Sequence, residues 1–297
     1  MQSISRWLYS QSHHGSIGLA LSLLLPFSMI IGGAIMIALL LNFSFFKVLY
    51  QSFVAIVFLI LFGFFVNLDI NEIILNAFLT WFPAIILSVI FLKNKSITLT
   101  VQILSLITII FLTIFNFYIS DSNYFWSQTL IIFSDILLNS GFKEQANSIQ
   151  NQINIIAEQM TIMIAITLWS LYSFVLLLGE KIYKSSLKDE CNFGNFGNLN
   201  LGRSIAFFVA ISSFFLLVFE AEWLKDIAYL GFLFFWLQGL AIFHWLYVNG
   251  LLPKVGLVAL YVMMLFLNIL MVMLLAVVGY TDVWFNFRSK IKRTKNQ

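Results

Sequence analysis

One ionisable side chain lies inside a long apolar segment of this sequence: His244, within residues 227–248. Titratable groups inside a membrane are costly and often mark functional sites, so His244 is a candidate ligand-binding residue. It also lies four residues from the end of its segment, beside Trp245 and Tyr247, where a neutral imidazole reaches interfacial water, and we favour this structural interpretation. Gln238 is a second candidate, but six helical positions, about 240°, place it on a different face from His244.

Two polar stripes at helical spacing run along neighbouring apolar segments. Their members are Thr98, Gln102, Ser105 and Asn116 on one segment, and Asn76, Thr80 and Pro83 on the preceding one. Polar side chains in lipid need hydrogen-bond partners, and two helices joined by a short loop can supply them to each other. The stripes are therefore either interhelical hydrogen bonds, which we favour, or the lining of a small-ligand site. The candidate ligand-binding residues for such a site are Asn76, Thr80, Gln102, Ser105, Gln238 and His244.

The other residues that could bind a metal ion or act in catalysis do not have the spacing that such sites need. The acidic stretch Glu220-Ala-Glu222 with Asp226 has no further cation ligands, and His13-His14 has no third ligand nearby. The chain contains no H-E-x-x-H, no Gly-rich phosphate loop ending in Lys, and no G-x-S-x-G. The single cysteine, Cys191, excludes an internal disulfide. We expect no catalytic residue, no metal and no cofactor, and so a protein that is not an enzyme.

Eight apolar segments must position these residues. They span 17–41, 48–66, 73–92, 97–119, 159–179, 204–219, 227–248 and 255–281. Each segment is free of Asp, Glu, Lys and Arg, and most contain about 20 residues, enough to cross about 30 Å of hydrocarbon as a helix. Charged residues make up only 10% of the chain, against about 25% in a soluble domain. The sequence predicts an all-α, polytopic membrane helical bundle.

The first and last segments are expected to be broken. Segment 17–41 contains Pro26 and Gly32-Gly33, which break or kink helices, and segment 255–281 has Asn268 in mid-span. Between residues 42 and 254, one set of loops has eight basic and three acidic residues, and the alternating set has two basic and nine acidic. The positive-inside rule places the first set in the cytoplasm. With both end segments doubling back, both termini are cytoplasmic, in a bacterial inner membrane.

The chain then divides into five parts. These are a cytoplasmic tail (1–16), N-terminal membrane segments (17–119), an extracytoplasmic hairpin (120–158), C-terminal membrane segments (159–281) and a basic cytoplasmic tail (282–297). In the hairpin, an amphipathic stretch precedes a turn at 139–141, and the spacing from Ile149 to Met163 predicts a helix that continues into segment 159–179. The repeat NFGNFGNLN, at 192–200, is expected to be a flexible turn region.

The basic tail suggests a lipid partner. It carries Arg288, Lys290, Lys292, Arg293 and Lys295 within eight positions. Near an anionic membrane each such residue contributes about 1 kcal/mol of attraction. We therefore expect the bilayer, and anionic lipids at this tail, as partners, and we do not expect nucleic acid.

The C-terminal third resembles the YybS-like bacterial membrane proteins, a family of unknown function. The residues that carry the likeness are Gln238-Gly239 with His244, Leu201-Gly202-Arg203, and Gly279-Tyr-Thr-Asp282-Val-Trp284-Phe-Asn-Phe287-Arg288. Asn286 and Thr281 depart from the pattern, which commonly has an acidic and a small aliphatic residue there. Asp282 could pair with Arg288, or cap the last helix while Arg288 lies at the headgroups. Arg203, Asp282, Trp284 and Arg288 are thus membrane-anchor or family-motif residues.

The YybS-like family is similar in predicted fold to the substrate-binding subunits of energy-coupling-factor vitamin importers. The resemblance implies a small-molecule-binding bundle without catalytic residues that docks a coupling or assembly protein. The function expected from the sequence is a non-enzymatic binding or transport-type component of the inner membrane. The alternative is a membrane-anchored scaffold or assembly protein that docks partners through the outer hairpin or the basic tail.

Overall fold

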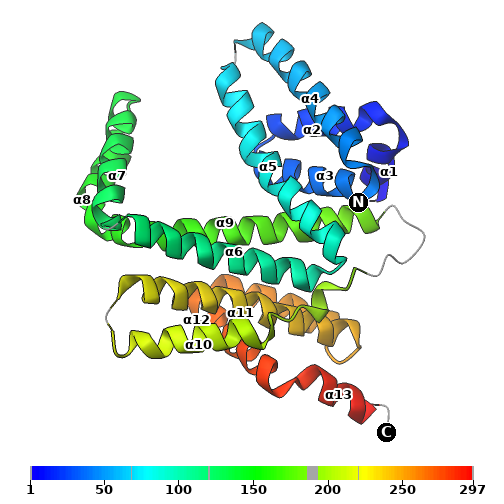
Figure 1. Ribbon diagram of the computed structural model, residues 1–297, viewed down its shortest axis with the longest axis vertical. Helices are drawn as coiled ribbons and strands as arrows, with labels where there is room; N and C mark the ends of the chain where they lie inside the picture. The colour runs from blue at the N-terminus through cyan, green and yellow to red at the C-terminus, as the bar shows by residue number, and fades with distance from the viewer. Residues whose placement is uncertain (1, 68, 120, 186–192, 220, 296–297) are drawn as a thin grey trace. The chain divides into compact units, whose positions relative to one another are not determined.

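The computed structural model describes residues 2–67, 69–119, 121–185, 193–219 and 221–295, without the side chains of Glu222 and residues 292–295. In these ranges the chain forms thirteen α-helices and one 3₁₀ turn, and no strand (Figure 1). Six helices are long and apolar enough to cross a membrane: Phe45–Val66 (α4), Ile70–Asn94 (α5), Ile97–Tyr118 (α6), Ile153–Lys184 (α9), Trp223–Val248 within α11, and Lys254–Phe285 (α12). The predicted all-α, multi-pass membrane fold is confirmed.

The helices group into two compact units. The first comprises Met1–Val101 with Ser170–Phe196, and the second comprises Gln102–Trp169 with Gly197–Gln297. Helices α6 and α9 each contribute residues to both units.

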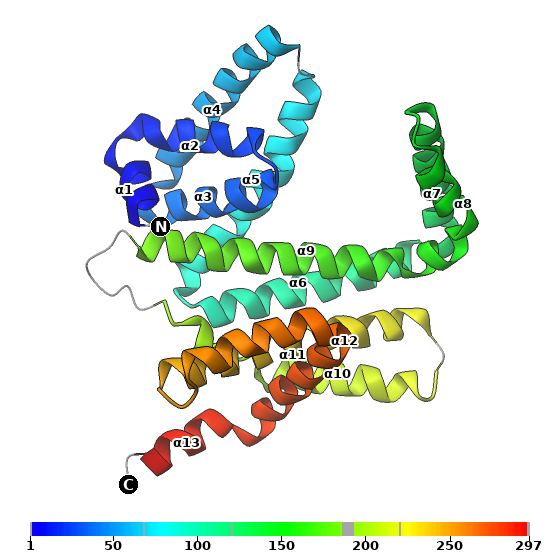
Figure 2. The ribbon, with the colours of Figure 1, turned by 180° about the vertical axis from the view of Figure 1, so that it is seen from behind.

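In the first unit, the predicted segment 17–41 forms two helices, α2 (Ser12–Leu24) and α3 (Ser28–Asn42), which lie side by side in Figures 1 and 2. The break follows Pro26, where Phe27 has a φ of 62°. The break at Pro26 is therefore confirmed, but Gly32 and Gly33 do not break the chain. They lie inside α3 and allow close packing, since a Cβ at Gly32 would come within 2.9 Å of Thr80.

Helix α1 (Gln2–Ser10) packs against this pair. The Tyr9 hydroxyl donates a hydrogen bond to the carbonyl oxygen of Ala38 in α3, at 3.2 Å. Burial raises the pKa of Tyr9, so the hydroxyl keeps its proton and remains a donor.

In the second unit, α7 (Ser122–Asn139) and α8 (Lys143–Asn151) form the predicted helical hairpin, turning at Gly141 with a φ of 88°. Inside it, the buried hydroxyl of Ser134 donates to the carbonyl oxygen of Ala146 at 3.3 Å. The predicted continuous helix from Ile149 is wrong. Helix α8 ends at Asn151 and α9 begins at Ile153, so the chain breaks at Gln152 without a glycine or proline to signal it.

The remaining helices of this unit are α10 (Gly202–Leu216), α11 (Glu222–Val248), α12 and α13 (Phe287–Lys295). The predicted segment 204–219 corresponds to α10, whose 15 residues extend only about 23 Å, less than the hydrocarbon thickness. Helix α12 contains one non-helical residue, Asn268, with φ 27° and ψ −101°. Figures 1 and 2 show that α12 changes direction sharply near its middle, which confirms the predicted break at Asn268.

Candidate functional site

Two glycines bring the backbones of α11 and α12 into contact. A Cβ at Gly239 would overlap the carbonyl oxygen of Leu275, and a Cβ at Gly279 would overlap that of Phe235 and lie 2.7 Å from the amide nitrogen of Gly239. Small residues at such crossings let membrane helices approach closely, which favours van der Waals packing and short polar contacts. The crossing brings Gln238 of α11 within reach of Asp282 of α12.

A buried polar network, the Arg288 network, grows from this crossing. The Arg288 Nε and Nη2 atoms donate to Asp282 Oδ2 at 3.1 and 2.7 Å, and Nη1 donates to the carbonyl oxygen of Gly197 at 2.7 Å. Gln238 donates to Asp282 Oδ2 at 3.4 Å and accepts from the amide nitrogen of Leu201 at 2.8 Å. Three separate stretches of the chain, residues 197–201, α11 and the passage from α12 to α13, therefore meet at one ion pair.

Burial of the ion pair decides between the two roles that the sequence left open for Asp282. Asp282 is 1% exposed and Arg288 is 8% exposed. Arg288 therefore pairs with Asp282 inside the protein instead of extending freely among the headgroups. Asp282 Oδ1 has no hydrogen-bond partner among the described residues, and the carboxylate is stabilised there by Arg288 and Gln238.

The end of the Asn/Gly/Phe repeat is an ordered part of this site, which sequence reasoning missed. Residues Phe196–Asn198 form a 3₁₀ turn, and a Cβ at Gly197 would come within 3.0 Å of the Trp245 backbone. Leu199 and Leu201 are fully buried. The expected flexible turn is thus wrong for these residues, because the repeat composition did not reveal the Trp245 backbone or the Arg288 side chain as partners.

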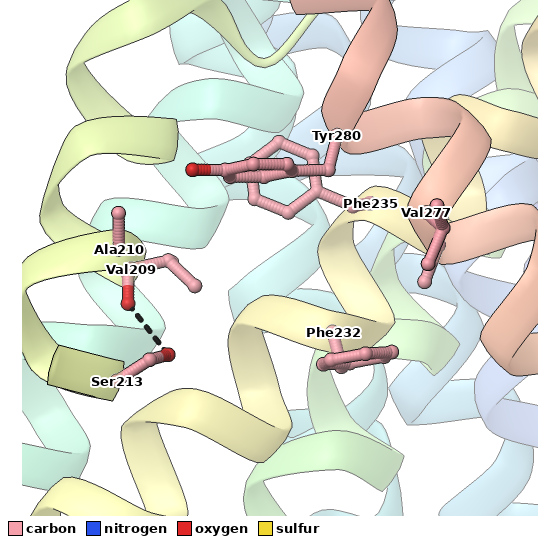
Figure 3. A pocket seen from close by; sticks show the side chains of 8 residues that line it. Val209, Ala210, Ser213, Phe232, Phe235, Val277 and Tyr280 are labelled. Carbon is pink, nitrogen blue, oxygen red and sulfur yellow. Dashed lines mark hydrogen bonds between the residues drawn. The ribbon is translucent and has the colours of Figure 1, made fainter. Parts of the chain in front are cut away.

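An apolar pocket of about 270 Å³, shown in Figure 3, opens between α10, α11 and α12. Its walls are Val209, Ala210, Ser213, Phe232, Phe235, Ala276, Val277 and Tyr280. The Ser213 hydroxyl is satisfied by the Val209 carbonyl oxygen at 2.8 Å. The Tyr280 ring packs edge-on against Phe235, and its hydroxyl is directed toward the side that α10 forms. The pocket presents aromatic walls and the Tyr280 hydroxyl.

The polar stripes, for which the sequence favours hydrogen bonds over a ligand cavity, have hydrogen-bond partners within the protein. Asn76 Oδ1 accepts from Ser28 at 3.1 Å and from Thr80 at 3.3 Å, which joins α3 and α5. In the second unit, Gln102 donates to the carbonyl oxygen of Asn200 at 2.7 Å, and Ser105 accepts from the Trp169 indole at 3.0 Å. These contacts support the hydrogen-bonding interpretation of Asn76, Thr80, Gln102 and Ser105.

The other candidates lie apart from the pocket walls. His244 Nε2 forms a hydrogen bond of 2.7 Å with the Tyr261 hydroxyl, on the part of α12 before Asn268. Trp284 is 40% exposed and stacks edge-on near Tyr280, as an interfacial anchor would. Arg203 is exposed in the first turn of α10. Glu220 of the acidic stretch and Cys191 lie outside the described residues.

Comparison of this chain with protein-family models, with curated proteins and with solved structures finds no match. The resemblance of the C-terminal third to the YybS-like proteins therefore stays a prediction.

Proposed function

We propose that this protein is a non-enzymatic, membrane-embedded binding or transport-type component that holds a small, mainly apolar molecule. The observation that carries the proposal is the apolar pocket between α10, α11 and α12. Its volume of about 270 Å³ lies near the lower end of the range for small-molecule sites, about 300–1,000 Å³.

The chemistry of the walls supports a ligand that is apolar apart from one polar group. Lipid chains are as apolar as Phe232 or Val277, so removing apolar surface from water cannot draw a molecule from the bilayer into the pocket. Selection must come from shape, from contacts with aromatic rings, and from a hydrogen bond. Phe232 and Phe235 supply the rings, and Tyr280 supplies the hydroxyl.

The proposed location is a bacterial inner membrane, with both termini in the cytoplasm. The alternating charge of the loops supports this orientation. Two structural features are consistent with it: segment 17–41 forms two helices of 13 and 15 residues, too short for separate full crossings, and α12 turns at Asn268.

A matched pair of substitutions tests the proposed pocket. Ala210→Phe fills the pocket from α10, whereas Ala259→Phe adds the same atoms at an exposed position of α12. Protein reconstituted in nanodiscs is analysed by native mass spectrometry, followed by extraction and identification of retained small molecules. We expect a retained molecule in the natural protein and in Ala259→Phe, and its loss in Ala210→Phe. A natural protein that retains nothing, or equal retention in all three, contradicts the proposal.

A membrane-anchored scaffold is the second candidate, and the α7–α8 hairpin favours it. Helix α7 exposes Tyr124, Ile132 and Ile136, each by more than half, while its opposite face is closed by α8. Photo-crosslinkers placed at Ile132 and Ile136 in cells should then capture a specific protein. Capture of lipid alone would assign this face to the membrane surface and leave the binding function as the better account.

A further inference from the structure

A second hollow, the polar pocket, lies where α12 passes into α13. It has a volume of about 250 Å³ and is lined by Asn198, Asn200, Trp245, Asn286, Arg288 and Ser289. Three amides, a hydroxyl and a guanidinium line it, and none of the lining residues that the structure describes is a carboxylate. It shares no residue with the apolar pocket, so it needs a ligand of different chemistry.

The donors of the polar pocket are held in place by the fold. The Arg288 network uses three of the five N–H groups of the guanidinium, which leaves two for a ligand while the side chain cannot swing away. Asn200 is fixed because its Oδ1 accepts from the amide nitrogen of Gly202 at 2.9 Å. A site whose donors are already positioned loses little entropy when a ligand binds.

The charge around the polar pocket favours an anion. Asp282 balances Arg288, but α13 has the sequence FRSKIKRTK, with four further basic residues and no acidic one. The pocket also lies over the first turn of α13, since Asn286 precedes the helix and Arg288 and Ser289 belong to that turn. Helix N-termini add unpaired N–H groups and a partial positive charge.

The position of the polar pocket near the membrane surface indicates which class of anion it binds. Helix α12 ends at Phe285, and the exposed rings of Trp284 and Phe285 are typical of the headgroup zone. We propose that the polar pocket binds an anionic phosphate group at the membrane surface, either the headgroup of an anionic phospholipid or a soluble phosphate ester. Asn286 and Arg288 donate to its oxygens, since the Ser289 hydroxyl already donates to the carbonyl oxygen of Asn286 at 2.9 Å. The rest of α13 supplies long-range attraction.

Two double variants distinguish the contribution of the polar pocket to phosphate binding from that of the positive charge along α13. Asn286→Gly with Ser289→Ala removes the side-chain amide of Asn286 from the polar pocket, together with the Ser289 hydroxyl that donates to the carbonyl oxygen of Asn286. Glycine suits the left-handed backbone at Asn286, where φ is 50°, so the fold should persist. Lys292→Gln with Arg293→Gln changes the same number of positions and removes two charges from the α13 sequence, while the six described lining residues stay unchanged.

The measurement uses the full chain in nanodiscs that contain equal amounts of phosphatidylglycerol and phosphatidylcholine. Native mass spectrometry gives the ratio of the two lipids retained. We expect the natural protein to prefer phosphatidylglycerol and the pocket variant to lose about tenfold of that preference, as for one hydrogen bond to a charged group. The tail variant should keep most of it. Loss in the tail variant with full retention in the pocket variant overturns the proposal, because diffuse charge then suffices.

A second arm identifies the source of the phosphate. The same proteins, in nanodiscs of phosphatidylcholine alone, are titrated with glycerol phosphate by calorimetry. Binding that the pocket variant loses, with no preference for phosphatidylglycerol in the first arm, supports the proposal with a soluble ester as ligand. If the pocket variant changes neither phosphatidylglycerol retention nor glycerol phosphate binding, the polar pocket does not bind phosphate and the proposal fails.

Discussion

The two halves of α12 have similar apolar composition but opposite surroundings. In residues 254–267 most large side chains are exposed, with Leu265 at 83% and Phe266 at 82%, and Leu260 is the buried member. In residues 269–285, Met271, Leu275, Ala276, Gly279, Asp282 and Val283 are all buried. Hydropathy does not distinguish the halves. The difference comes from Gly279, which admits a neighbouring backbone, and from Asp282, which must be partnered.

The largest predicted effect is at the α11–α12 crossing. In Gly279→Leu the new side chain overlaps the backbone of Phe235, which cannot move unless the helices separate. We expect no folded monomer by size-exclusion chromatography in detergent. Val258→Leu enlarges an exposed side chain in the first half and should change the unfolding free energy by less than about 0.5 kcal/mol. A folded Gly279→Leu protein would show that both halves of α12 accept a larger side chain equally well.

The next effect concerns the buried ion pair. Arg288→Ala leaves the Asp282 carboxylate buried without its cation, which should lower the unfolding free energy by about 3–5 kcal/mol. The double variant Asp282→Leu with Arg288→Met removes both charges and should recover much of that loss. Unfolding in mixed micelles with increasing denaturing detergent gives the stability of each protein, and the single variants Asp282→Leu and Arg288→Met complete the cycle. Additive effects of the two substitutions would contradict coupling between the residues.

Asn268, which separates the halves, should show a smaller effect. Its φ of 27° is unfavourable for side chains with a branched Cβ, so Asn268→Val should cost about 1–3 kcal/mol. Asn268→Gly accepts this backbone and should match or exceed the natural stability. Thermal unfolding in nanodiscs compares the two variants. Equal melting temperatures for Val and Gly would indicate that the break does not depend on this backbone conformation.

The smallest effect is expected in the first half. Tyr261→Phe removes the hydrogen bond to His244, which is partly exposed, and hydrogen bonds between membrane helices average about 0.6 kcal/mol. We expect a shift of about that size in the same unfolding assay. If Tyr261→Phe lowered the unfolding free energy as much as Arg288→Ala does, contacts in the two halves of α12 would contribute equally to stability.

The membrane fold could be predicted because its cause is compositional. Lipid excludes ionic groups, and in lipid the backbone N–H and C=O groups must form hydrogen bonds within the protein. Long segments without charge therefore predict helices directly. Pro26 signals a break through its own geometry, whatever surrounds it. Asn268 indicated the break in segment 255–281, because a lone polar residue in the middle of a membrane span has few structural roles. The charge pattern likewise indicated that Asp282 and Arg288 could pair.

The rest could not be predicted because it depends on distant partners. The sequence alone does not distinguish a glycine that breaks a helix from a glycine that lets a neighbouring helix pack closely against it. Gly32 was expected to break its segment, and it packs against Thr80 instead. Gly197 looked like part of a flexible repeat, and only the approach of Trp245 and Arg288 gives it a role. The apolar pocket has no sequence signal, since its walls resemble any lipid-facing helix surface.

The contact between Gly197 and Arg288 also has a consequence for how the protein is made. The two residues are 91 positions apart, and α10, α11 and α12 lie between them. While the ribosome is still producing those helices, the carbonyl oxygen of Gly197 has no guanidinium to meet. The hydrogen bond between Arg288 and Gly197 therefore forms only after α10, α11 and α12 have been synthesised, as a late step in biogenesis.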